Sequence, residues 1–153
     1  MPDLPPPAPE VRPRLLIPAL GCLYRPLSAL AETLLRVVAG GALVTHGWGK
    51  IQDPFGAAGM VAELGFHPAN LWSLLLSLTE FVGGLCIALG LLTRPAALAA
   101  SFLLCVTTYF HGVVQAEGWA GAEKSVIWLA VRLFFVIRGS NRHSVDALIG
   151  RQV

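Results

Sequence analysis

Four polar side chains lie in long apolar runs of the sequence, where a polar residue needs a specific reason. His46 and His111 lie near the ends of their runs, Glu80 lies in the run between them, and Lys50 follows His46 by one helical turn. If these runs are membrane helices, a rise of about 1.5 Å per residue puts both imidazoles about 7 Å inside the outer surface, with Glu80 somewhat deeper. Imidazoles above a carboxylate could bind a quinone head-group, relay protons, or hold a metal or haem.

The two histidines also allow a structural interpretation, in which they cap helix ends and bond to backbone carbonyls or lipid head-groups. Zinc sites usually have several protein ligands at characteristic spacing, and two histidines alone do not define one. Cys22, Cys86 and Cys105 form no CxxC pair, and Cys86 and Cys105 lie in apolar runs, where free cysteine usually behaves as a small apolar residue. We therefore predict no metal site, and a quinone stays a candidate cofactor or ligand.

A second set of charges lies within the same runs, where an ionisable group normally faces the bundle interior and has a partner. Counted from the inner helix ends, Arg36 would lie about 12 Å deep and Glu80 about 18 Å deep, an offset that a long arginine side chain can cover. We predict a buried Arg36–Glu80 ion pair. Glu32 could share it or reach Arg132, which would lie roughly 9 Å from the inner end of its helix. The pair could serve function or only hold the helices together.

These residues lie in four apolar runs, at residues 28–51, 71–92, 95–115 and 122–138. A bilayer core about 30 Å thick needs about 20 helical residues, so the first three runs can span it, and the fourth can if it extends through Trp119. Small residues such as Gly40 and Gly47 share one helical face, as close packing between membrane helices requires. We predict an all-α fold, an integral membrane four-helix bundle over residues 28–138.

The composition supports this fold class. Of the 153 residues, 55% are hydrophobic and 13% are charged, and the mean hydropathy is +0.66. A soluble domain has roughly 25% charged residues. The net charge of +2 comes without a basic face, so we expect no nucleic-acid partner and take the lipid bilayer as the main partner.

The remaining segments are polar or rich in proline. We predict a disordered proline-rich tail at residues 1–14, an interfacial segment at 15–27 and a cytoplasmic tail at 139–153. We expect no cleavable signal peptide, because the first apolar stretch is short and broken by Pro18. Between the first two runs, Asp53 and Pro54 indicate the start of a short helix and Gly65 indicates its end.

The distribution of basic residues predicts the orientation. With the N-terminus inside, the inner segments hold seven arginines and the outer segments hold two lysines: Arg12, Arg14, Arg25, Arg94, Arg138, Arg142 and Arg151 against Lys50 and Lys124. Positive charge concentrates on the cytoplasmic side of membrane proteins, so we predict that both termini are cytoplasmic. Trp48, Trp72 and Trp119 would then form an aromatic belt at the outer interface.

Several short motifs, in this order, resemble the DoxX family of small four-helix bacterial membrane proteins. They are HGWGKI at residues 46–51, Phe55-Gly56 and GFHP at 65–68, EFVGGL at 80–85, GLLTR at 90–94, Phe110-His111, and GSNRHSVD at 139–146. The resemblance covers residues 28 to about 149. It implies a multi-pass protein of the bacterial cytoplasmic (inner) membrane with a loose link to membrane redox chemistry, since relatives include subunits of a thiosulfate–quinone oxidoreductase.

The sequence departs from the family pattern at two places. Gly139-Ser140-Asn141 stands where the family often has Gly-Pro-Gly, and Arg132 stands where small residues are common. The arginine indicates an ion pair or a partner particular to this chain.

Three functions are compatible with these features. The first is a redox-linked accessory subunit that binds a quinone near the outer leaflet and serves an oxidoreductase partner, which must supply the electron chemistry because the chain has no self-sufficient catalytic motif. The second is a non-enzymatic membrane scaffold or assembly factor whose buried ion pair fixes the helix register. The third is a small-solute permease acting as an oligomer, which should have spans broken near the midplane, and none is evident.

Overall fold

The computed structural model describes residues 16–150, so the predicted tail at residues 1–14 lies outside the described part of the chain. Within that part every regular element is a helix, which confirms the all-α prediction. The longer helices are α1 (Gly21–Gln52), α3 (Ala69–Leu78), α5 (Thr93–Tyr109) and α6 (Gly118–Arg138), and the short ones are α2 (Ala58–Glu63), α4 (Gly84–Leu89), α7 (Val145–Ile149) and a 3₁₀ turn at Pro18–Leu20. Two π-helical segments, Thr79–Gly83 and Phe110–Val114, join α3 to α4 and extend α5.

Three helical stretches are long and apolar enough to cross a membrane: Pro18–Gln52, Ala69–Leu89 and Thr93–Val114. A continuous helix is suited to this environment because it satisfies its own backbone hydrogen bonds where no water is present. α6 is also long enough at 21 residues, but it carries four charged side chains, Glu123, Lys124, Arg132 and Arg138. Its crossing of the membrane stays a prediction.

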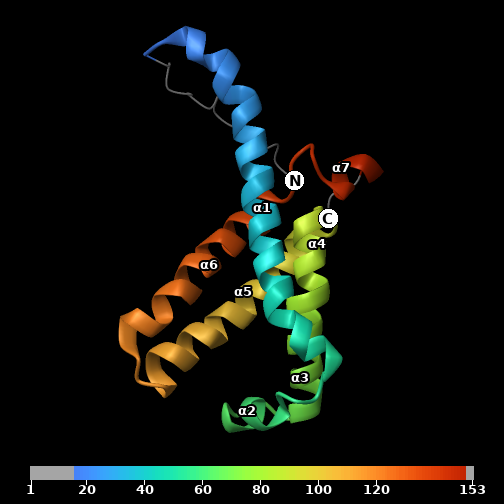
Figure 1. The fold of residues 1–153 in the computed structure, drawn as a ribbon, viewed down its shortest axis with the longest axis vertical. Coiled ribbons are helices and arrows are strands. Elements are labelled where there is room, and N and C mark those ends of the chain that lie inside the picture. Colours follow the sequence, from blue (N-terminus) through green and yellow to red (C-terminus); the bar gives the residue numbers. More distant parts are fainter. Residues whose placement is uncertain (1–15, 151–153) are drawn as a thin grey trace, which may run out of the picture.

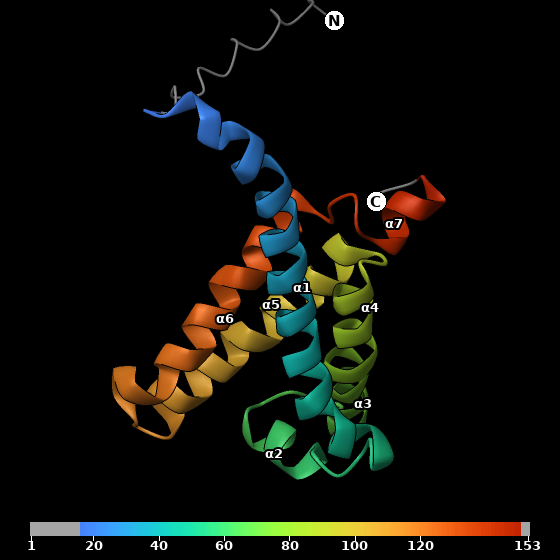
Figure 2. The ribbon, with the colours of Figure 1, turned by 45° about the horizontal axis from the view of Figure 1, so that its top comes forward.

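The long helices form two antiparallel pairs. α1 packs along the continuous rod made by α3, the first π-helical segment and α4, while α5 packs along α6. Figures 1 and 2 show the pairs close together near the C-terminal segment and diverging toward the end where α2 lies. The helices are therefore arranged as two pairs that diverge at one end, and the four-helix membrane bundle stays a prediction.

The helix bounds differ most from the predicted ones around α1. This helix begins at Gly21, seven residues before the predicted start at 28, and it contains Pro26, although proline removes one helical hydrogen bond. Asp53 does not begin the short helix; it follows the last residue of α1, and two turns delay α2 until Ala58. Gly65 has a φ of +85° just after α2, as expected for a residue that ends a helix.

Glycines allow the close approach of α1 to the α3–α4 rod. A Cβ atom at Gly40 would lie 2.6 Å from the carbonyl oxygen of Gly84, and one at Gly47 would lie 2.6 Å from the backbone nitrogen of Phe81. Both clashes are with backbone atoms, which cannot rotate away. The backbone of α1 therefore contacts the backbone of the α3–α4 rod along this face, as the small-residue pattern predicts.

We expect Gly40→Ala to lower the unfolding temperature of the purified protein, and Gly41→Ala to leave it unchanged or raise it. A Cβ at Gly41 would meet no atom within 4 Å, so alanine there gains only helix propensity, about 1 kcal/mol. Overpacking at Gly40 should cost about 1–3 kcal/mol. Thermal unfolding in detergent measures both, and equal transition temperatures for the two adjacent variants would contradict this packing.

Candidate functional site: a cavity between the helix pairs

A cavity of about 600 Å³ lies between the two helix pairs. Its wall is mainly apolar, with side chains from α1, α2, α3, α5 and α6. All four residues of the predicted quinone or proton-relay group line it: His46, Lys50, Glu80 and His111. Small-molecule sites in proteins typically have about 300–1,000 Å³ and an apolar wall with a few placed polar groups. The cavity has the dimensions and the chemistry of such a site.

Glu80 is a buried carboxylate whose partner is Lys50. The Glu80 side chain is 7% exposed, and its Oε2 lies 2.5 Å from Nζ of Lys50, whose side chain is 34% exposed. A carboxylate can remain charged at such a place when a cation neutralises it and donates a hydrogen bond to it. The pair joins α1 to the first π-helical segment at the edge of the cavity.

His111 has its own acidic partner across the turn from α5 to α6. Its Nδ1 lies 2.9 Å from Oε2 of Glu117, and the backbone N–H of Glu117 donates to the carbonyl of His111. The two side chains are 37% and 46% exposed, so water can reach them. The contact with Glu117 occupies one ring nitrogen of the imidazole and leaves Nε2 as a possible hydrogen-bonding atom. His46 faces the same cavity from α1 and is exposed.

Two of these residues lie in π-helical segments, which the sequence did not reveal. Glu80 lies in the segment Thr79–Gly83 and His111 lies in Phe110–Val114. A π-helical turn inserts one extra residue into a helix and redirects the side chains around it, and such turns are frequent at functional sites. No periodicity of apolar residues marks them, because the helix on either side stays regular.

The predicted Arg36–Glu80 pair does not form, because the two residues lie at different levels of the helix pair. Nη1 of Arg36 donates to the carbonyls of Ile87 and Ala88, both at 3.0 Å, and Nη2 donates to the carbonyl of His143 at 2.7 Å. Glu80 instead lies opposite Gly47, eleven residues or about 16 Å further along α1. The prediction assumed that the inner ends of the first two helices are level. α1 in fact extends beyond the turn after α4 (Figure 1).

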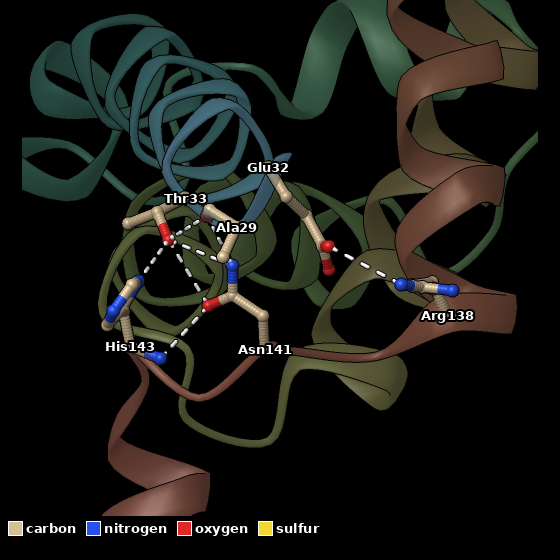
Figure 3. A network of polar contacts seen from close by, with 6 residues as sticks. All are labelled: Ala29, Glu32, Thr33, Arg138, Asn141 and His143. Carbon is tan, nitrogen blue, oxygen red and sulfur yellow. Dashed lines mark hydrogen bonds and ion pairs between the residues drawn. The ribbon is translucent and has the colours of Figure 1, made fainter. Parts of the chain in front are cut away.

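Glu32 and Arg132 also have partners other than the predicted ones. Oε2 of Glu32 lies 3.7 Å from Nη2 of Arg138, the last residue of α6 (Figure 3). Arg132 is 2% exposed, lines the cavity, and donates from Nη2 to the carbonyl of Ala39 at 2.7 Å. Its guanidinium carbon lies 5.9 Å from the ring centre of Trp128, within the range of a cation–π contact.

A polar network ties the segment after α6 to α1 and to the turn between α4 and α5. The side-chain amide of Asn141 donates to the carbonyl of Ala29 and to Oγ1 of Thr33, and His143 lies beside Thr33 (Figure 3). Asp146 accepts hydrogen bonds from the backbone N–H groups of Leu92 and Thr93. The sequence marked this segment only through its resemblance to the family, because the partners are distant in sequence.

Comparisons with known proteins found a family model and a relative that match this chain. The DoxX family model matches residues 31–112. The inner membrane protein YqjF of Escherichia coli (strain K12) is 34% identical over 112 residues, which are 71% of this chain and 84% of that protein. No solved structure matches the chain significantly. The region that matches the family model ends before α6. It includes all four residues of the predicted quinone or proton-relay group.

We expect Glu80→Gln and Lys50→Met each to destabilise the protein, and the double variant to recover part of that loss. Breaking one side of a fully buried ion pair costs about 3–5 kcal/mol, and exposure of Lys50 should reduce this value, whereas removing both charges can be nearly neutral. Unfolding measurements on the two singles and the double give the coupling energy.

Arg36→Gln combined with Glu80→Gln is the matched control for that cycle. Since Arg36 and Glu80 have separate partners, their effects on unfolding should add to within about 0.5 kcal/mol. Strong coupling between Arg36 and Glu80, with none between Lys50 and Glu80, would overturn the assignment of partners.

Proposed function

This chain belongs to the DoxX family and is an inner-membrane protein, and from this premise we propose that it binds a quinone in the cavity between its helix pairs. In this proposal it is an accessory subunit, and an oxidoreductase partner supplies the electrons. The observation that supports it is the grouping of His46, His111 and the Lys50–Glu80 pair around one apolar cavity.

The polar groups match what quinone chemistry requires. A quinone has a flat apolar ring and carbonyl oxygens that accept hydrogen bonds, so an apolar wall with imidazole and ammonium donors is complementary to it. Reduction of a quinone to a quinol consumes two electrons and two protons. The pairs Lys50–Glu80 and His111–Glu117 are ionisable groups that can deliver protons, provided that each lies within hydrogen-bond reach or one bridging water.

A scaffold or assembly role is the second candidate, and the network around Arg36, Asn141 and Asp146 favours it. That network uses buried polar groups only to hold segments of the chain together. If the cavity is filled by lipid alone, the same residues suffice for a rigid membrane platform. Ligand binding by the cavity residues distinguishes the two roles.

We expect a short-chain ubiquinone analogue to quench the tryptophan fluorescence of the purified protein, because Trp72 and Trp128 line the cavity. A variant carrying both His46→Ala and His111→Ala should bind the analogue at least about tenfold more weakly, the loss expected for one or two hydrogen bonds. The matched control is His67→Gln, an exposed histidine that does not line the cavity. Equal affinity in the double variant and the wild type would leave the scaffold role as the better one.

We expect reporters fused after Arg94 and after Val153 to be cytoplasmic, and a reporter in the loop between Gln52 and Asn70 to be external. The reason for this orientation is that the predicted inner segments hold seven arginines, whereas the outer segments hold two lysines. Asp146 binds the backbone at Leu92 and Thr93, so the first two sites should lie on the same side of the membrane. Opposite signals from them would show that α6 does not cross.

A further inference from the structure

Arg132 is a buried cation that lacks partners for most of its donors. Of its three guanidinium nitrogens, only Nη2 donates a hydrogen bond, to the carbonyl of Ala39. Nε and Nη1 have no hydrogen-bond partner in the described part of the chain. Nε carries one N–H and Nη1 carries two, so most of the guanidinium fork is unpaired. The side chain is 2% exposed and forms part of the cavity wall.

The acidic residues around the cavity are already paired with other cations. Glu80 and Glu117 are the carboxylates of its wall, and they pair with Lys50 and His111. Glu32, the acid that the sequence offered to Arg132, lies against Arg138 instead. Between residues 16 and 150, no carboxylate therefore forms an ion pair with Arg132. Its positive charge has no counter-charge within the described chain.

Arg36 shows what a structural arginine of this protein looks like. It is equally buried at 2% exposed and its Nε is also unpaired, yet its two terminal nitrogens donate to three backbone carbonyls. Arg132 makes one such bond, leaves Nε and Nη1 without a partner, and belongs to the wall of the cavity. A water molecule carries no charge, so it would leave the guanidinium without a counter-charge, and an unpaired buried charge is costly.

We infer that the cavity binds an amphipathic anion, with a carboxylate or a similar oxyanion on Arg132 and an apolar body along the wall. Guanidinium groups form their strongest hydrogen bonds with such oxyanions. Arg132 lies eight residues after Lys124, which also lines the cavity, so about 12 Å of helix separates them, enough for an apolar body to lie along the wall. Apolar side chains such as Leu43 and Leu104 line the cavity.

This site does not depend on the quinone proposal. The family region that matches ends at residue 112, whereas Arg132 belongs to α6. The histidines of the quinone proposal lie near the ends of α1 and of the helix formed by α5 and its π-helical extension. The anion site is therefore a feature of α6 in this chain.

Decanoate tests the inference on the purified full-length protein in an uncharged detergent, with decanol and acetate as the two comparison probes. Decanol keeps the apolar body without the charge, and acetate keeps the charge without the body. Tryptophan fluorescence reports binding because Trp128 lies beside Arg132. We expect decanoate to bind at least tenfold more tightly than either comparison probe, and to raise the unfolding temperature.

The variants assign that preference to one side chain. Arg132→Met should remove the preference of decanoate over decanol, and unchanged binding of decanol to this variant shows that its cavity is still folded, since methionine replaces the buried apolar stem without the charge. Arg132→Lys should keep part of the preference, and Lys124→Gln, which removes an exposed charge of the same cavity, should keep all of it.

A preference that survives Arg132→Met, or equal binding of decanol and decanoate to the wild type, would overturn the site. Equal binding of acetate and decanoate would overturn its amphipathic character. Failure of the quinone proposal can be recognised separately, because its test measures binding of the ubiquinone analogue to the variant with His46→Ala and His111→Ala, whereas this test measures the preference of decanoate over decanol and its loss in Arg132→Met.

Discussion

The structure depends on the hydrogen bonds of the buried Arg36 guanidinium. They lie at the end of the molecule where the two helix pairs are close together, which we call the closed end. A charge inside an apolar bundle must find polar partners, and Arg36 finds them in the carbonyls of Ile87 and Ala88 at the end of α4 and in the carbonyl of His143. The last carbonyls of a helix have no helical partner and lie at the negative end of its dipole, so a cation is favourable there. One side chain thus joins α1, α4 and the segment after α6.

The backbone around Arg36 is shaped to admit it. Gly90 has a φ of +74°, and a Cβ there would collide with the guanidinium of Arg36 and with Ser144. Asp146 then fixes the turn from α4 to α5 by accepting from Leu92 and Thr93, while its own N–H donates to the carbonyl of Gly90. Because these contacts hold the pairs together at one end, the pairs are free to diverge at the other, and the cavity lies in the space between them.

The helices and the depths of the polar residues follow from the same physical argument. Long apolar runs without competing strand signals indicate helices in a membrane, and residues near the outer ends of such runs lie at similar depths. This argument put His46 and His111 at about the same depth, and both line the cavity. The same depth argument failed for Arg36, because it needs helix ends that are level, and α1 continues past the turn that ends α4.

Other features could not be derived from one sequence. The two π-helical segments leave the apolar pattern around Glu80 and His111 unchanged, so only the backbone reveals them. The contacts of Asn141 with Ala29 and Thr33 join residues more than a hundred positions apart, and no local pattern encodes such a distance. Arg132 was recognisable as unusual for its family, but its lack of a carboxylate partner depends on where Glu32 and Arg138 lie.

The two buried arginines differ in their relation to the cavity. Both terminal nitrogens of Arg36 donate to backbone carbonyls, and Arg36 does not line the cavity, whereas Arg132 lines it and has one hydrogen bond. A neutral quinone near His46 and His111 would use the polar groups close to α2 and the turn after α5, and it would leave the charge on Arg132 uncompensated. An anion on Arg132 would neutralise that charge and leave the histidines free. The two ligands therefore make separate demands on one cavity, whose volume of about 600 Å³ lies within the range typical of small-molecule sites.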